Sequence, residues 1–89
     1  MEEALLKITG KVQGVFYRDN TREKAVELGL KGFAENISDG SVLVCVQGEK
    51  SKIEDFIIRC HEGSPSAQVD RVEVTWCEPV DNFDSFEIR

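Results

Sequence analysis

With 89 residues, of which 11 are Lys or Arg and 17 are Asp or Glu, the chain is long enough for one domain with one small core. Its content of 40% hydrophobic and 31% charged residues is typical of a globular protein and excludes a disordered or fibrous chain. The formal net charge of −6 argues against nucleic acid and anionic membranes as partners, because both are themselves negatively charged.

The sequence also lacks the patterns of a membrane span and of an export signal. Its longest apolar run without a charge, Ser41 to Gly48, is far shorter than the roughly 20 residues that a membrane helix needs. The opening residues Met1 to Ala4 include two acids where a secretory signal has a basic region followed by an apolar one. We therefore expect a cytoplasmic protein.

The cysteines do not have the spacing of a metal site. Cys45, Cys60 and Cys77 are far apart, form no Cys-x-x-Cys pair and have only His61 to assist them. We interpret them as buried apolar thiols and expect neither a metal nor another cofactor, although the sequence leaves their redox state open. His61 is assigned no catalytic role, because its place near the end of a predicted helix suits a partly charged imidazole.

The first strand and the first helix are indicated by two different periods of apolar residues. Apolar and polar residues alternate from Ala4 to Val12, which is typical of a half-buried strand. A helical stripe with spacings of four, four and three then begins at Tyr17, and Gly29 provides a stop signal. This pattern predicts a helix from Arg18 to Leu28.

Two strands and a second helix follow. The segments Leu30 to Ile37 and Val42 to Gln47 are predicted strands, and the turn Ser38 to Ser41 between them contains the Asp-Gly dipeptide of a hairpin, so they should pair antiparallel. Apolar residues at i, i+3, i+4 and i+7 from Ile53 to Cys60 predict a helix, with Ser51 as its N-cap.

The remaining elements complete a fold class. Val72, Val74 and Trp76 alternate on a fourth strand, and Phe86 with Ile88 indicates a short strand at the C-terminus. The order βαββαβ with one added strand predicts an α+β, ferredoxin-like two-layer sandwich, in which an antiparallel sheet carries both helices on one face. We expect residues 1–89 to form a single domain.

The turn that precedes the first helix is the first candidate for chemistry. Arg18 falls in the first helical turn, where the helix dipole disfavours a positive charge, so an anion bound there would compensate. Unpaired N–H groups and a guanidinium together suit a phosphate, and Gly14 allows the backbone to approach it closely. An alternative is that Arg18 pairs with Asp19 or Glu23 at the surface. The Walker pattern and its magnesium ligand are absent, which disfavours nucleotide hydrolysis.

Asn36, at the end of the second strand, is the second candidate. Asparagine favours turns, and turn chemistry alone explains an Asn just before the hairpin. Asn36-Ile37-Ser38 also matches a glycosylation acceptor, which carries no meaning without an export signal.

Together these two stretches resemble the signatures of the acylphosphatase family. The first is Gly10-Lys11-Val12-Gln13-Gly14-Val15-Phe16-Tyr17-Arg18, and the second is Gly32-Phe33-Ala34-Glu35-Asn36 followed by Gly40, Val42 and Gly48. The segments Gly63 to Val69 and Phe86 to Ile88 are similar as well, so the resemblance extends over nearly the whole chain.

The resemblance implies the same fold and the hydrolysis of acyl phosphates to a carboxylate and inorganic phosphate. Arg18 matches the family's arginine that binds phosphate, and Asn36 matches its asparagine that orients the attacking water. The turn from Gln13 through Gly14, Val15 and Phe16 to Tyr17 is implied to supply backbone donors to the phosphate. We expect a monomer that acts on a small acyl phosphate without a metal; acyl and carbamoyl phosphates are not distinguished.

Two residues depart from the family pattern. Tyr17 stands where Phe is more usual, and as a nearly isosteric residue it is expected to have little effect. Glu35 stands where a basic or neutral residue is usual, and its charge is expected to weaken the binding of anionic substrates slightly. Residues 1–24 carry a net charge of +1 and the remaining residues −7, so any anion site depends on local charge.

Other functions remain open at this point. The main alternative is a non-catalytic ferredoxin-like module that binds a small anion or regulates a partner. A stand-alone relative of the acylphosphatase-like domain of hydrogenase-maturation carbamoyl-transfer proteins would use carbamoyl phosphate. An RNA-binding ferredoxin-like domain is disfavoured by the negative charge and the few aromatic residues.

Overall fold

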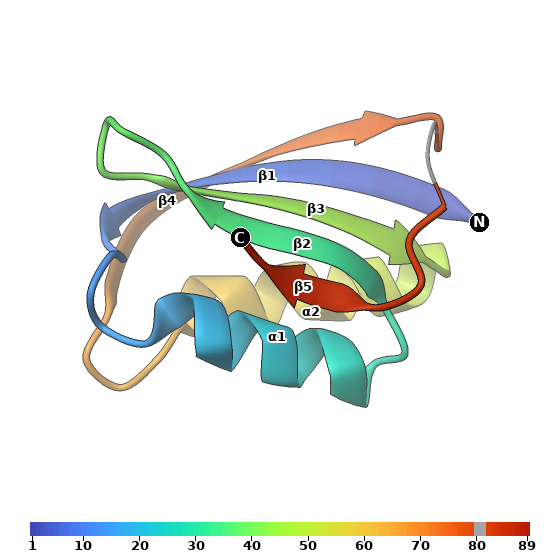
Figure 1. Ribbon diagram of the computed structural model, residues 1–89. Coiled ribbons are helices and arrows are strands. Elements are labelled where there is room, and N and C mark those ends of the chain that lie inside the picture. The colour runs from blue at the N-terminus through green and yellow to red at the C-terminus, as the bar shows by residue number, and fades with distance from the viewer. Residues whose placement is uncertain (80–81) are drawn as a thin grey trace.

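Seven elements follow one another in the order that the sequence pattern predicts. The computed structural model describes residues 1–79 and 82–89. In chain order the elements are β1 (Glu2–Lys11), α1 (Tyr17–Glu27), β2 (Lys31–Asn36), β3 (Val42–Gly48), α2 (Lys50–Glu62), β4 (Gln68–Cys77) and β5 (Phe86–Ile88) (Figure 1). The largest difference is in β4, which begins at Gln68 rather than at Val72 because it pairs with β1 as far as Lys11.

The strands form one sheet in the order β4-β1-β3-β2-β5. Leu6 of β1 lies opposite Val44 on one side and Val74 on the other, and all pairs among the four long strands are antiparallel, as predicted. β5 is parallel to β2, with Phe86 opposite Gly32, so the sheet is mixed rather than antiparallel throughout. The βαββαβ core is thus the ferredoxin-like arrangement, extended at the β2 edge.

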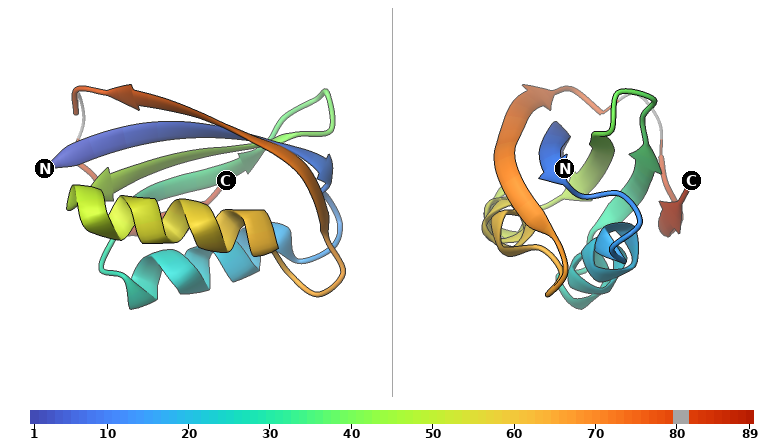
Figure 2. Two further views of the ribbon diagram at one scale, coloured as in Figure 1. Left: turned by 180° about the vertical axis from the view of Figure 1, so that it is seen from behind. Right: turned by 90° about the vertical axis from the view of Figure 1, so that its left-hand side faces the viewer.

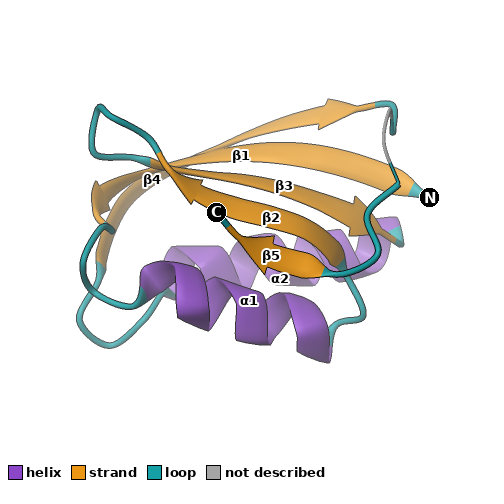
Figure 3. Cartoon of the chain, in the orientation of Figure 1, coloured by secondary structure: helices purple, strands orange, loops and turns teal. Residues whose placement is uncertain are grey.

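Both helices pack against one face of this sheet, as Figures 2 and 3 show. The helices contribute to the core on the predicted stripes, with Tyr17, Thr21 and Ala25 buried on α1 and Ile53, Phe56 and Cys60 on α2. Each large apolar side chain buried there contributes on the order of 1.5–3 kcal/mol. One small core between two layers therefore holds the domain together, in agreement with the length of the chain.

The helix starts differ from the prediction. α1 begins at Tyr17, one residue earlier than expected. The expectation that Ser51 caps α2 is wrong: Glu49 is the N-cap residue, the N–H of Ile53 donates to the carbonyl of Glu49 at 3.0 Å, and Ser51 lies inside the helix. Serine is a frequent N-cap, but here the helix begins at Lys50, about one turn before Ile53, the first apolar residue of its stripe.

β1 ends in a bulge that leads into the loop before α1. The register between β1 and β4 shifts between Thr9 and Gly10. Gly10 has φ 127°, and a Cβ atom at this position would overlap the main-chain oxygen of Gln68, so only glycine fits. Val12, two residues after Gly10, is almost fully buried, so the start of the loop packs against the core.

Candidate active site

The loop at residues 13–16 curls tightly before α1 begins. Gly14 has φ 72° and Phe16 has φ 61°, while Val15 between them has no positive φ. Residues of alternating handedness turn successive N–H groups toward one side of the backbone, which makes a concave surface for an anion. Phe16 is the one non-glycine residue with positive φ in the described part of the chain. Such backbone strain is concentrated at functional sites.

The first turn of α1 lacks a capping side chain. Phe16 holds the N-cap position without a side-chain hydrogen bond, and the first N–H to find a helical acceptor is that of Asn20, which donates to the Phe16 carbonyl at 3.1 Å. The N–H groups of Tyr17, Arg18 and Asp19 therefore have no acceptor within the helix. With the positive end of the helix dipole, they form a cluster of donors suited to an anion.

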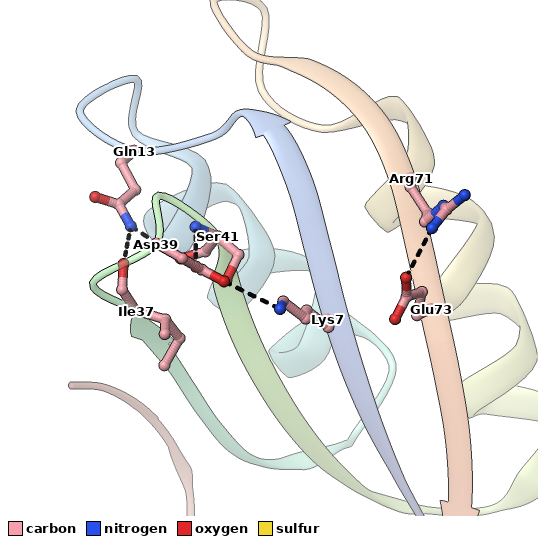
Figure 4. Close-up of polar contacts among 7 residues, drawn as sticks. All are labelled: Lys7, Gln13, Ile37, Asp39, Ser41, Arg71 and Glu73. Carbon is pink, nitrogen blue, oxygen red and sulfur yellow. Dashed lines mark hydrogen bonds and ion pairs between the residues drawn. The ribbon is translucent and has the colours of Figure 1, made fainter.

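Gln13 joins this loop to the β2–β3 hairpin. Its Nε2 donates to the carbonyl oxygen of Ile37 at 2.8 Å and to that of Ser41 at 2.9 Å, as Figure 4 shows for the contact with Ile37. Both acceptors lie in the turn that begins directly after Asn36. The side chain of Gln13 is therefore a strut that holds the loop and the end of β2 together, rather than a group directed at a ligand.

The hairpin turn is itself firmly held. The Oδ1 of Asp39 accepts hydrogen bonds from the N–H of Ser41 at 2.9 Å and from its hydroxyl, and Lys7 Nζ lies 3.0 Å from Asp39 Oδ2 (Figure 4). The hydrogen bonds from Ser41, together with Lys7, hold the pKa of Asp39 well below its usual range. A rigid turn gives Gln13 a fixed anchor.

On its other side the loop is bonded to α2 and the residues after it. The buried Ser64 hydroxyl donates to the carbonyl of Val15 at 2.7 Å, and the Tyr17 hydroxyl donates to the carbonyl of Cys60 at 2.8 Å. Burial raises the pKa of the Tyr17 phenol, so it remains a donor. Tyr17 was expected to act as a substitute for Phe, but its hydroxyl adds a buried link between the two helices.

The side chain of Arg18 turns away from its acidic neighbours. Its Nη1 donates to the main-chain oxygen of Arg89 at 2.6 Å, and it forms no ion pair with Asp19 or Glu23 within residues 1–79 and 82–89. Instead, Oδ1 of Asp19 lies 3.9 Å from Nη2 of Arg22. The alternative in which Arg18 simply pairs at the surface is therefore not what the structure shows.

Arg89 is positioned by β2. Its N–H donates to the carbonyl of Ala34 at 2.8 Å, and its guanidinium lies 4.0 Å from the ring centre of Phe33. The last residues thus extend along the β2 edge, and the C-terminus lies beside the end of β2 in Figure 1. Arg18 is thus connected through Arg89 to Ala34, which lies two residues before Asn36 in β2.

A cavity of about 270 Å³ opens at the N-terminus of α1. Its lining consists of Val12, Gly14, Phe16, Tyr17, Arg18, Asp19 and Ile88. Four of the residues predicted to bind phosphate are thus brought together there. The other two in that prediction, Gln13 and Val15, are engaged by the hairpin and by Ser64 and do not line the cavity.

Asn36 is not among the residues that line the cavity, but it directly precedes Ile37, whose carbonyl accepts the hydrogen bond from Gln13. It is the last residue of β2, lies opposite Val42, and is exposed. By the alternation of a strand it shares the helix-covered face with Ala34, and Glu35 lies on the opposite face. Within the described part of the chain its side chain makes no hydrogen bond.

Other residues considered at the sequence level lie away from the cavity. Cys45 and Cys60 are buried as expected, Cys77 is half-buried, and burial raises the pKa of Cys60 to about 12. His61 is exposed in the last turn of α2. Within residues 1–79 and 82–89 no group of three His, Cys, Asp or Glu side chains could hold a metal ion. In the same part of the chain, neither helix has the length and apolar character to cross a membrane.

Three residues were not predicted from the sequence to contribute to the site. Ser64 fastens the loop, Ile88 lines the cavity, and Arg89 receives the Arg18 guanidinium. All three are far from the loop along the chain. Ile88 and Arg89 reach the site because β5 pairs with β2, and no local sequence pattern predicts that pairing.

The comparisons with known proteins agree across the chain. The family model described as Acylphosphatase matches residues 4–88. The acylphosphatase of Anaeromyxobacter dehalogenans is 40% identical over 97% of this chain and 92% of its own, and that of Haloquadratum walsbyi is 44% identical over 92% and 87%.

Solved structures show the same fold. The crystal structure of acylphosphatase from Bacillus subtilis superposes with a TM-score of 0.97 at 27% identity, covering 100% of this chain and 99% of that one. The chain is also similar to part of full-length HypF, crystallised in a phosphate- and nucleotide-bound form, with a TM-score of 0.89 at 32% identity. That likeness covers 99% of this chain and 12% of HypF.

Proposed function

The chain belongs to the acylphosphatase family of acyl phosphate hydrolases, and from this premise we propose that it binds the phosphate of its substrate in the cavity at the start of α1. The observation that carries this proposal is the uncapped N-terminus of α1, where Tyr17, Arg18 and Asp19 have N–H groups without a helical acceptor and all three residues line the cavity. Phosphate at this position completes the hydrogen bonding of the first turn and compensates the charge of Arg18.

Arg18 is held ready for the phosphate. A guanidinium has five N–H donors in a rigid fork, and the contact with Arg89 uses one end of it. The remaining donors can reach the phosphate oxygens, which are the atoms on which negative charge accumulates during transfer. Because the contact with Arg89 orients the side chain beforehand, little freedom is lost when substrate binds.

Asn36 holds the attacking water in this proposal. The water oxygen attacks phosphorus, the bond between phosphorus and the carboxyl oxygen breaks, and the carboxylate leaves with the bonding electron pair. Its parent acid has a pKa of about 4–5, so the leaving group needs no general acid. A phosphate oxygen of the substrate accepts the proton from the water. Orientation and charge neutralisation suffice, which is why two side chains and a row of amides are adequate.

The rest of the proposal concerns how the protein works as a whole. We propose that it acts as one domain, as a monomer in the cytoplasm, on a small acyl phosphate and without a metal ion or nucleic acid. Rates measured with and without magnesium test the metal-free reaction, and sedimentation tests the monomer.

Two substitutions separate the roles of the two side chains. Asn36→Ala is expected to lower kcat by about tenfold or more, because the attacking water is no longer oriented. The inhibition constant of inorganic phosphate should stay nearly unchanged, because Asn36 does not bind the phosphate in this proposal. Arg18→Lys is expected to weaken phosphate inhibition and activity together, because an ammonium cannot form the bidentate fork. Asn82→Ala is a matched control, since it removes an exposed asparagine that lies outside the helices and strands.

The outcomes distinguish the alternatives. If Asn36→Ala weakens phosphate inhibition as strongly as it lowers kcat, Asn36 is a phosphate ligand and not the group that orients water. If wild type binds phosphate but hydrolyses no acyl phosphate, the chain is the non-catalytic anion-binding module that the sequence also allows.

A further inference from the structure

Phe16 is a residue that folding alone does not explain. Its side chain is 77% exposed, the most exposed of the large apolar side chains in the described part of the chain. Its φ of 61° is a conformation that Gly and Asn adopt far more readily than an aromatic residue. It also occupies an N-cap position, where Ser, Thr, Asp or Asn would stabilise the helix. Burial, backbone and capping all disfavour phenylalanine here.

The surroundings of Phe16 indicate what its ring can contact. The cavity lining has a polar part, to which Arg18 and Asp19 of the first helical turn belong, and an apolar part, formed by Phe16, Val12 and Ile88. Val12 is almost fully buried and Ile88 half-buried, so the exposed ring of Phe16 contributes most of the accessible apolar surface. The two kinds of lining meet within one small cavity.

No wider apolar surface along α1 accounts for Phe16. The next exposed apolar side chain on α1 is Val26, which is 64% exposed. It lies ten residues further along, about 15 Å on the helix axis, and so does not form a continuous patch with Phe16.

We propose that the Phe16 ring, with Ile88 beside it, binds the acyl group of the substrate and makes this enzyme selective for aromatic or long aliphatic acyl phosphates over acetyl and carbamoyl phosphate. The inference rests on phosphate binding at Arg18, because a phosphate held there leaves the attached acyl group toward the apolar part of the lining. The ring is a specificity-determining contact and takes no part in the chemistry. It binds the acyl group equally in the ground state and the transition state, so it acts on KM.

The test compares two substrates in four proteins. Steady-state kinetics with benzoyl phosphate and with acetyl phosphate are measured for wild type, Phe16→Gly, Phe16→Leu and Val26→Ala. Glycine tolerates the left-handed backbone and has no side chain that could cap the first turn of α1, so Phe16→Gly removes the ring and leaves the N–H groups of that turn open. Val26→Ala controls for loss of an exposed apolar side chain elsewhere on α1. Circular dichroism establishes that each protein is folded, and Phe16→Leu carries the test if Phe16→Gly is not.

The expected result is a selective loss. Phe16→Gly lowers the ratio of kcat/KM for benzoyl phosphate to kcat/KM for acetyl phosphate by about 3–10-fold, the range of a ring-to-ring contact, and the selective loss lies in the KM of benzoyl phosphate. Any effect of the substitution on the phosphate loop acts on both substrates and cancels in this ratio. Phe16→Leu is intermediate, and Val26→Ala has the ratio of wild type. Equal losses for both substrates, or an unchanged ratio between them, overturn the inference while leaving the hydrolase proposal intact. Failure of wild type to hydrolyse either substrate refutes both.

Discussion

The buried hydrogen bond from Ser64 to Val15 makes a sharp prediction about stability. Ser64→Ala deletes the hydroxyl that donates to the Val15 carbonyl at 2.7 Å and leaves that oxygen without this donor. Ser64 is 4% exposed and Val15 8% exposed, so water cannot easily replace the lost donor. Loss of a partner at a buried polar atom costs about 1–3 kcal/mol. In a chain of 89 residues this corresponds to a fall in Tm of about 5–15 °C.

Thermal unfolding followed by circular dichroism measures this effect, with Ser66→Ala as the matched control. Ser66 is exposed two residues further on, so its variant should unfold within about 2 °C of wild type. Because Ser64 also fastens the phosphate loop, Ser64→Ala should raise the inhibition constant of inorganic phosphate. If the two variants lower Tm equally, or Ser64→Ala leaves it unchanged, the hydrogen bond does not stabilise the loop as argued.

Three further predictions follow from particular contacts. Gly32→Ala places a Cβ against the main-chain oxygen of Cys45, so it should lower the urea midpoint of unfolding strongly, by the equivalent of about 3 kcal/mol or more. Gln13→Ala removes the strut to the hairpin, so kcat in the acyl phosphate assay should fall while the far-ultraviolet circular dichroism stays native, because the loop and Asn36 lose their fixed separation. Burial raises the pKa of Cys60 from 9.0 to about 12, so the folded protein binds this proton more tightly than the unfolded chain does. The stability that Cys60 contributes should therefore be complete below pH 9 and be lost as pH rises toward 12. Cys60→Ala should show a shallower fall of stability over this range.

Each of these predictions has an opposing outcome. A native urea midpoint in Gly32→Ala would mean that the strands can separate at no cost. Unchanged kcat in Gln13→Ala would show that the strut does not position the water. Parallel pH profiles for wild type and Cys60→Ala would assign the alkaline loss of stability to other groups.

The fold was predictable from local patterns because each element has one apolar face. The stripe from Ile53 to Cys60 and the alternation in β1 depend only on which residues are apolar, and the core requires both. The N-cap of α2 was predicted wrongly at Ser51, since capping preference is weak compared with the packing and hydrogen bonding that begin the helix at Glu49. The parallel pairing of β5 depends on contacts distant in sequence and has no local signal.

The candidate site was predictable in part. The positive charge of Arg18 is unfavourable at the N-terminal, positive end of the helix dipole. A residue that is unfavourable for local structure often has a functional role. Asn36 had no signal beyond turn chemistry until the family resemblance was considered. The contacts of Arg18 with Arg89 and of Val15 with Ser64 join residues more than 45 positions apart, so only the three-dimensional structure shows them.

The most direct test of the account measures phosphate release from benzoyl phosphate in the presence of EDTA. Wild type, Arg18→Ala and the matched control Arg22→Ala, which removes an exposed arginine from the same helix, are compared after each is shown to be folded. The account predicts rapid turnover by wild type and Arg22→Ala and a loss on the order of 10³-fold or more in Arg18→Ala. More than about a tenth of wild-type activity in Arg18→Ala, or turnover only after magnesium is restored, would contradict it.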